Sequence, residues 1–557
     1  MRRLVEVSRP IRWSPVPAHA RAWWLAVVAA TVGEVGCGNW ADKLACGDQG
    51  CGFTKDEWAR VQSLANVGAK PAVPDPSNKY LPIEDTQGTL RQDAVHDPVV
   101  QLGWHLYYEP LISGSVYNKD SLGAPAPTTR PVGGTGQINL SCASCHDPQR
   151  GGSDYTSEPR HVSVGAGWYD VNAQQTLNAA RFPVLYWNGR TDTLWAQAAQ
   201  VMESPVSMNG NRMKTFWVIV TRYRESYQAA AFDAPSPSEI DAVAALLGPA
   251  PDLAGSDTAK FMKQYNGLPS LPLDPTDPLQ LSPQDIVTRV HVNAAKAIAA
   301  YEWLLSSDGS PFDKYASEGT NSSALSPAAI RGLRLFIGKA SCIDCHNTPM
   351  LSDGRFHNIG IPQIGDHVPT AEACLSSPCD CSNGNTGPTC LPAGAYAGHQ
   401  KLVDPPATNV FHRGTVYDDS ASPSSIPDTT APPASLMGAW RTPSLRDVAL
   451  TAPYMHDGSL ATLSDVVWHY SQADSSGTLG TSVLSPLTLS AQDRDDLVAF
   501  LESLTGEPGP REILGSPPVA DENPDGGLGF TPDGGLGLTP DGGLAFTPDG
   551  GVGLDRP

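Results

Sequence analysis

The sequence predicts a mainly α-helical protein of two domains, wrapped by long irregular segments. The chain has 557 residues, more than the roughly 100 to 200 that one domain usually contains. Several windows show apolar residues at helical spacing behind residues that cap helices. The 53 glycines and 51 prolines favour irregular connections between these helices. The 13 tryptophans argue against a structureless chain.

Capping residues mark where the helices should begin. A Ser or Thr that precedes an acidic residue by three positions, or a Pro at the first helical position, is typical of a helix start. The starts predicted in this way are Thr54, Ser282, Ser326 and Ser490, and the spacing of Leu102 and Leu106 predicts a further helix from about Pro98. The first helix should run to about residue 67, and the last should end at Gly506.

Segments of irregular composition separate the rest of the chain into a strap, two domains and a tail. We expect an N-terminal strap at 37–97, a first domain at 98–320, and a second domain at 321–506 that carries a cysteine-rich insertion at about 364–436. We hypothesise that the insertion covers a docking face. Residues 507–557 should be a disordered tail, because a Pro-Asp-Gly-Gly unit recurs there four times with little to bury.

The first 36 residues predict export to the periplasm. Five arginines precede an apolar run at 22–30, which is too short to span a bilayer that needs about 20 apolar residues. The segment Val35-Gly36-Cys37-Gly38 resembles a bacterial lipoprotein processing site, so Cys37 should carry a lipid anchor. Cleavage at a neighbouring site without lipid is the alternative.

Six other cysteines should form disulfides in that oxidising compartment. Cys46 should pair with Cys51. The insertion should hold two disulfides in one of three connectivities, with zinc binding as the alternative; its cysteines are Cys374, Cys379, Cys381 and Cys390. A net charge of −21 argues against a nucleic-acid partner and favours a basic protein partner.

Two Cys-X-X-Cys-His motifs predict two covalently bound haem c groups. They are Cys142-Ala-Ser-Cys145-His146 and Cys342-Ile-Asp-Cys345-His346. The two thiols of such a motif add to the haem vinyl groups, and the adjacent imidazole binds the iron. A zinc knuckle or a disulfide pair is the alternative for one motif, but two such motifs in an exported chain favour haem.

Further segments carry a family resemblance, among them Tyr186-Trp187-Asn188-Gly189-Arg190, Ala300-Tyr301-Glu302 and most of residues 441–470. Over roughly residues 98–506 the chain resembles the bacterial di-haem cytochrome c peroxidases, and within them the MauG-like members. The resemblance implies two α-helical, cytochrome c-like haem domains that face each other. The first haem would react with peroxide, and the second would pass electrons to it.

The resemblance also implies an open first haem. In relatives that need activation by reduction, a histidine that blocks this iron stands where the chain has Ala166, and alanine cannot bind iron. His161 is a nearby candidate that could block it instead. The family places a glutamate for proton transfer where this chain has Ser207, which cannot act as a carboxylic acid. Glu203 or an ordered water could replace it, or turnover with peroxide could be slow.

Four further roles follow from the resemblance. Trp187 would relay electrons between the haems, although a tryptophan here could also be a core residue. Tyr470 would be the second ligand of the second haem and would stabilise oxidised iron, with neighbouring His469 or a nearby methionine as the alternative. A calcium ion would lie between the domains, with Asn172, Thr451 and Pro453 as its protein ligands.

Together these features predict an exported di-haem oxidoreductase of the peroxidase type that reduces hydrogen peroxide. Its electron donor would be a redox protein such as a small cytochrome c or a cupredoxin, or an oxidisable protein substrate. A di-haem oxygenase that uses dioxygen is one alternative. A non-enzymatic electron-transfer cytochrome, in which both irons have two ligands from the protein, is another.

Overall fold

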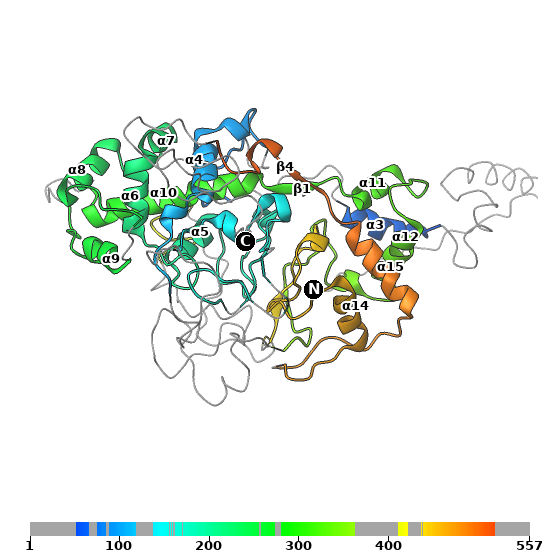
Figure 1. The fold of residues 1–557 in the computed structure, drawn as a ribbon. Coiled ribbons are helices and arrows are strands. Elements are labelled where there is room, and N and C mark those ends of the chain that lie inside the picture. The colour runs from blue at the N-terminus through cyan, green and yellow to red at the C-terminus, as the bar shows by residue number, and fades with distance from the viewer. Residues whose placement is uncertain are drawn as a thin grey trace, which may run out of the picture.

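The structure is a computed structural model in which the helices form two groups joined by a short sheet (Figure 1). It describes residues 52–65, 75–84, 89–117, 138–154, 156–157, 159, 162–169, 171–254, 258–272, 280–362, 410–420, 436, 438–478 and 480–518. The predicted lipid-bearing Cys37, the six disulfide cysteines and His161 lie outside these residues. Among the helices that it describes, none has both the length and the apolarity needed to cross a bilayer.

The first group of helices packs around α10, the longest of the described helices, at Pro283–Leu304. α10 crosses α4 at Gly103, where a side-chain Cβ would lie 1.9 Å from the Ala297 carbonyl oxygen. Only glycine therefore allows the two backbones to touch. The other helices of this group are α4 at Pro98–Tyr107, α5 at Leu194–Glu203, α6 at Arg212–Arg222, α7 at Arg224–Ala229, α8 at Pro237–Leu247 and α9 at Thr258–Asn266.

The second group of helices contains a similar close crossing of two helices at a glycine. A Cβ on Gly332 of α12 would lie 1.9 Å from the backbone oxygen of Asp496 on α15. Each helix group is thus built around a pair of helices that meet through a glycine. The helices of this group are α3 at Lys55–Leu64, α11 at Pro311–Glu318, α12 at Pro327–Ile337, α14 at Leu463–Gln472 and α15 at Ala491–Glu502.

The helix starts predicted from capping residues are confirmed. Ser282 accepts a hydrogen bond from the Asp285 backbone, and the Asp285 carboxylate accepts one from the Ser282 backbone. Such reciprocal bonds satisfy backbone N–H groups that have no partner within the helix. The helix ends were predicted too late, since α3 stops at Leu64 and α15 stops at Glu502.

The tail was predicted to begin too early. Strand β4 at Glu507–Gly509 pairs antiparallel with β1 at Ser306–Asp308 between the two helix groups (Figure 1). Beyond it, Ile513 is buried in the first core, and its carbonyl accepts a hydrogen bond of 2.8 Å from the Tyr301 hydroxyl. Residues 507–518 therefore belong to the fold, because an apolar side chain and a strand pairing hold them.

The boundary between the domains also differs from the prediction. α11, which was expected in the first domain, buries Phe312 and Tyr315 in the core of the second. α3, which was expected in a surface strap, buries Val61 and Leu64 in the same core. Among the described residues, the first helix therefore packs on the second domain, and the last segment, 507–518, packs on the first.

The insertion expected within the second domain reaches the first. Phe411 is buried in the first core, and its carbonyl accepts a hydrogen bond of 3.0 Å from the Gln200 side chain. Asp419 forms an ion pair of 2.8 Å with the buried Lys296 of α10. Residues 410–420 thus tie the second half of the sequence to the first helix group.

Candidate haem-binding site

The first Cys-X-X-Cys-His motif forms a tight turn on the wall of a large cavity. Cys142–Ser144 is a single 3₁₀ turn, and the His146 backbone donates a hydrogen bond of 2.9 Å to the Cys142 carbonyl. Cys142, Cys145 and His146 all line a cavity of about 250 Å³ between the two domains. The turn therefore brings two thiols and one imidazole to the wall of a single cavity.

The orientation of His146 suits a metal ligand. Its Nδ1 lies 3.3 Å from the Gly152 carbonyl oxygen, and the Tyr107 hydroxyl donates a hydrogen bond of 2.7 Å to the His146 carbonyl. Burial lowers the pKa of His146, so the ring is neutral at pH 7. A neutral imidazole whose Nδ1 faces a carbonyl keeps Nε2 available for a metal.

The second motif has the same geometry. The His346 backbone donates a hydrogen bond of 2.9 Å to the Cys342 carbonyl, and His346 Nδ1 lies 2.5 Å from the Leu351 carbonyl oxygen. Burial lowers the pKa of His346 to about 4. All four motif cysteines are thiols, so neither pair forms a disulfide. Two thiols and one oriented imidazole at each motif fit a covalently attached haem.

The structure separates Ala166 from the cavity wall. Ala166 is fully buried, whereas Gly165 and Ser207 line the cavity. The two loops are tightly joined, because the Ala166 backbone donates a hydrogen bond of 2.6 Å to the Ser207 carbonyl. A Cβ on Gly165 would lie 2.4 Å from that same carbonyl oxygen. A longer side chain at position 165 would therefore displace the Ser207 loop.

Three polar side chains on the cavity wall have buried atoms without a partner among the described residues. These atoms are Ser207 Oγ, Glu302 Oε2 and Arg441 Nη1. Burial raises the pKa of Glu302 to about 8, so this carboxyl holds a proton at pH 7. Sequence reasoning missed this role for Glu302, although the residue lies in one of the family segments and one helical turn after the cavity residue Ile298.

Glu203 is held by Arg212, and it is not one of the residues that line the cavity. Arg212 Nε lies 2.8 Å from Glu203 Oε1, and Arg212 Nη2 lies 2.7 Å from Glu203 Oε2. Burial by itself would raise the pKa of Glu203. The charges and hydrogen bonds around this carboxylate, among them the charge and hydrogen bonds of Arg212, outweigh burial and keep the pKa below its ordinary value. A carboxylate paired in this way cannot also donate a proton in the cavity.

Trp187 connects the first domain to the second. Its ring lines the cavity, and its Nε1 donates a hydrogen bond of 2.9 Å to the Asn172 carbonyl. Its own carbonyl accepts a hydrogen bond of 2.9 Å from the Arg441 backbone. Trp187 also contacts His456 edge to face, with ring centroids 6.4 Å apart. These contacts place one indole between the His146 cavity and the second domain.

Tyr470 lies beside the second motif. Burial, together with the nearby Cys342 and Cys345 sulfurs, raises the pKa of its hydroxyl. Among the described residues, no hydrogen bond reaches that hydroxyl. His469 points elsewhere, since its Nε2 lies 2.8 Å from the Ile359 carbonyl oxygen. Of these two neighbours, Tyr470 is therefore better placed to bind an iron attached at the second motif.

The three predicted calcium ligands line the same cavity. Asn172 donates a backbone hydrogen bond of 2.7 Å to the His456 carbonyl of the second domain. Thr451 and Pro453 belong to the second domain, so the three residues meet where the domains join. Oxygen atoms from both domains at one junction are compatible with a hard cation.

Comparison with known proteins agrees with this site. The sequence profile of the family described as di-haem cytochrome c peroxidase matches residues 97–248. The cytochrome-c peroxidase IdrP1 of Pseudomonas sp. strain SCT is 29% identical over 376 residues, which cover 67% of this chain and 77% of that protein. The methylamine utilization protein MauG of Methylorubrum extorquens is 28% identical over 370 residues, covering 66% and 74%.

Among solved structures, the diheme peroxidase BthA of Burkholderia thailandensis matches with a TM-score of 0.45 and 18% identity, over 82% of this chain and 97% of that one. Membership of a di-haem family implies two haem c groups. The pair of Cys-X-X-Cys-His turns and the relatives together identify the chain as a member of the di-haem cytochrome c peroxidase and MauG family of oxidoreductases.

Proposed function

We propose that the protein is an exported enzyme that reduces hydrogen peroxide at the haem bound by His146, with electrons supplied through the haem bound by His346. The observation that carries this proposal is the position of Trp187. Its indole lines the first cavity, while its carbonyl and ring contact Arg441 and His456 of the second domain. An oxidisable side chain at this junction gives electrons a route between the two haems.

The residues of the first site favour reaction with an oxidant from solution. A bound haem supplies an iron that can react with peroxide and change its oxidation state. Ala166 offers no ligand atom at the position where some relatives carry histidine. Ser207 presents a hydroxyl to the cavity but has no acidic proton to give. We therefore expect the site to be open, with a slower proton transfer than a carboxyl would allow.

Tyr470 would complete the second site. A phenol near iron loses its proton when it binds, because the metal charge compensates for burial. The resulting oxygen ligand is hard and anionic, which stabilises oxidised iron relative to reduced iron. His469 is kept from this role by its contact with the Ile359 carbonyl.

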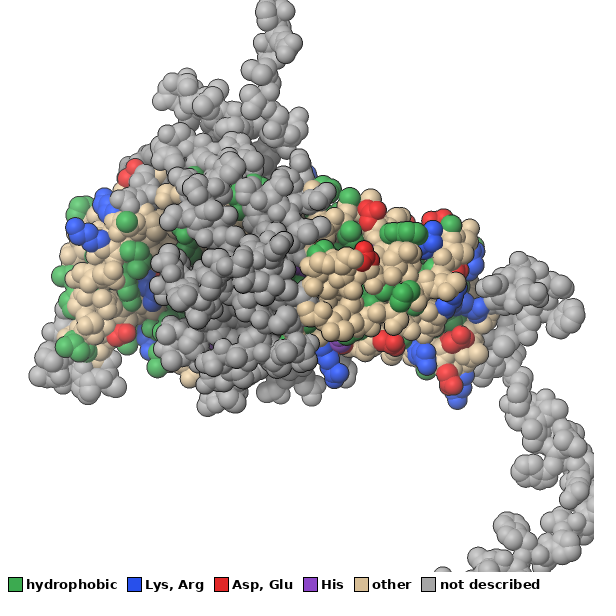
Figure 2. All heavy atoms as spheres, turned by 90° about the horizontal axis from the view of Figure 1, so that it is seen from below, with side chains coloured by type: hydrophobic (Ala, Val, Ile, Leu, Met, Phe, Trp, Pro, Cys, Tyr) green, Lys and Arg blue, Asp and Glu red, His purple; other side chains and the backbone are tan. Residues whose placement is uncertain are grey.

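The electron donor would be a small redox protein or an oxidisable protein substrate. The net charge of −21 favours a donor whose docking region is basic. On the face shown in Figure 2, acidic and basic side chains are intermixed over the end formed by the second domain. A docking site there would need matched charges rather than a single acidic patch.

Three further features belong to the proposal. Asn172, Thr451 and Pro453 would bind a calcium ion at the domain junction, with water as the remaining ligands. The N-terminal segment would direct export to the periplasm. Cys37 would then carry a lipid that anchors the protein to the membrane.

Ferric absorption and EPR spectra of the purified holoprotein test the proposal most directly. We expect one high-spin haem, open to peroxide, and one low-spin haem with two protein ligands. Hydrogen peroxide should then oxidise a reduced small cytochrome c in the presence of the enzyme. Two low-spin haems in both oxidation states would instead indicate an electron-transfer cytochrome, and turnover with dioxygen but not peroxide would indicate an oxygenase.

A further inference from the structure

A second tryptophan, Trp440, lies close to Trp187 where the two domains meet. Trp440 is buried, with 7% of its surface exposed, and its ring stacks on His456 with centroids 3.9 Å apart and planes 21° apart. The same His456 ring contacts Trp187 edge to face at 6.4 Å. Three aromatic rings are therefore in sequence across the junction, with the imidazole between two indoles.

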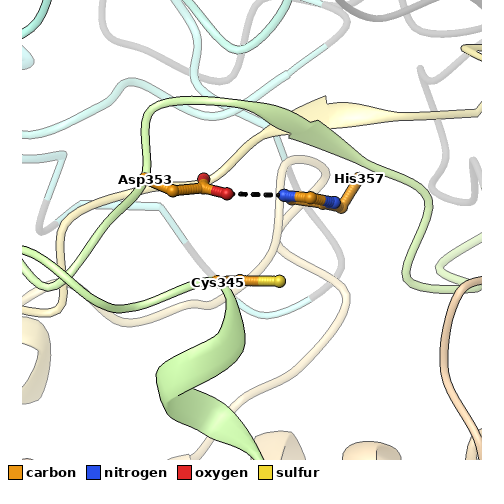
Figure 3. A group of neighbouring side chains, drawn as sticks. All are labelled: Cys345, Asp353 and His357. Atoms are coloured by element: carbon orange, nitrogen blue, oxygen red, sulfur yellow. Dashed lines mark hydrogen bonds and ion pairs between the residues drawn. The ribbon is translucent and has the colours of Figure 1, made fainter. Parts of the chain in front are cut away.

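The strand that carries Trp440 also pairs with a segment next to the second Cys-X-X-Cys-His motif. Strand β3, at Trp440–Arg441, pairs antiparallel with β2, at Phe356–His357, so that Trp440 lies directly opposite His357. The His357 ring points toward Asp353, with Nε2 and Oδ2 2.9 Å apart. Figure 3 shows the Cys345 sulfur beside this pair, and the ligand atoms of the three residues lie within 4.8 Å of one another.

Cysteine, aspartate and histidine at such distances are also typical of a metal site. Cys345, however, belongs to the motif that attaches the second haem, so its sulfur would be used in a thioether bond. The group therefore marks the edge of the second attachment site that lies beside β2 and β3. A continuous set of contacts then runs from the first cavity to this edge, through Trp187, His456, Trp440 and His357.

We propose that Trp440 is a second redox-active residue on the electron route between the haems. This inference rests on the proposed function, in which hydrogen peroxide is the oxidant. The Trp440 indole gives one electron to an oxidised Trp187 indole, which returns to its neutral form. Trp440 then receives one electron from the iron of the second haem, whose charge rises by one. No covalent bond changes, and the indole N–H proton stays in place.

Stopped-flow spectroscopy of the holoprotein tests this role. The second haem is reduced, peroxide is added, and oxidation of that haem is followed. Trp440→Phe keeps an aromatic ring against His456 but removes the easily oxidised indole, so we expect oxidation to slow by about tenfold or more, a modest increase in barrier. Trp440→Tyr should restore part of the rate, because a phenol is easier to oxidise than a phenyl ring.

Trp217→Phe is the matched control. Trp217 is also a buried tryptophan, but it lies on α6 and does not line the cavity. Its variant should transfer electrons at the parental rate. The resting EPR and absorption spectra of all variants should match the parent, which excludes a change in haem ligands. A parental rate in Trp440→Phe together with a slow rate in Trp187→Phe would overturn the inference.

Failure of the proposed function would look different. Peroxide would then leave the second haem of the parent protein reduced. Pulse radiolysis, which delivers one electron without peroxide, would still report the exchange of electrons between the haems. Slower exchange in Trp440→Phe than in Trp217→Phe would support the route, and equal exchange would refute it.

Discussion

Ser207 and Glu302 lie on the wall of the same cavity. Each has a buried oxygen that has no hydrogen-bond partner among the described residues. They come from different structural elements, a loop after α5 and the long helix α10. Buried polar atoms are normally paired, so atoms left in this way often belong to a site that binds something else. Ser207 therefore leads to a prediction about the reaction at the first haem, and Glu302 leads to one about the pH dependence of stability.

Introducing a carboxyl at Ser207 should accelerate the reaction with peroxide. Ser207→Glu would supply an acid that can move a proton between the peroxide oxygens, and such acid–base catalysis typically contributes about 10²-fold or more. Stopped-flow measurement of the second-order rate constant at the first haem checks this. Ser207→Gln is the control, because it has the same size without an acid. Equal rates in the two variants would mean that proton transfer does not limit the reaction.

Glu302 should make the protein less stable as the pH rises. Its folded pKa of about 8 lies above its usual value of 4.5. Between these values the folded carboxyl stays protonated while the unfolded one ionises, so stability falls from about pH 4.5 to pH 8 and then levels. Glu302→Gln removes this effect. Its melting temperature should exceed that of the parent at pH 8 and approach it near pH 5, whereas parallel pH profiles would contradict the prediction.

Tyr470 should set the reduction potential of the second haem. Tyr470→Met replaces a hard oxygen ligand by a soft sulfur ligand, which favours reduced iron, so the potential should rise. Tyr470→Phe should turn the low-spin signal of this haem into a high-spin one. Spectroelectrochemistry and EPR measure both effects. His469→Gln is the control, and a potential that moves with His469 but not with Tyr470 would reverse the ligand assignment.

The ion pair between Arg446 and Asp313 should be important for the stability of the second domain. Arg446 Nη1 lies 2.6 Å from Asp313 Oδ2, and both side chains are at most 5% exposed. Asp313→Asn would leave a buried guanidinium without its counter-charge, which costs about 3 to 5 kcal/mol of unfolding free energy. Glu507→Gln, in the exposed pair with Arg511, should change it by less than about 1 kcal/mol. Denaturant titration compares the two.

Phe411 should stabilise the first domain although it comes from the insertion. Its ring is buried beside His291, with centroids 5.6 Å apart. Phe411→Ala should lower the free energy of unfolding by about 3 to 5 kcal/mol, the usual loss for a buried phenylalanine. Val416→Ala, at a position 76% exposed, serves as the control. Similar losses in both variants would mean that the segment does not pack as an element of the first core.

The features predicted correctly from the sequence are local ones. A helix start depends on a few neighbouring residues, so Ser282 and Ser490 could be recognised from a capping residue and an acid three positions later. The same holds for the Cys-X-X-Cys-His motifs, whose short spacing places two thiols and one imidazole on a single turn. The spacing predicted His146 and His346 as ligands, while the carbonyls of Gly152 and Leu351, which lie beside their Nδ1 atoms, orient the two rings.

The tertiary structure decided which distant residues share an environment. Glu302 holds a proton because α10 buries it at a cavity, and the contact of the Trp187 ring with His456 depends on how the two domains meet. Phe411 joins the first core from a segment predicted to belong to the second domain. Burial and contact between remote segments arise from packing of the whole chain, so neighbouring residues carry little information about them. The sequence thus determined the haem-binding chemistry, while packing decided the surroundings that tune it.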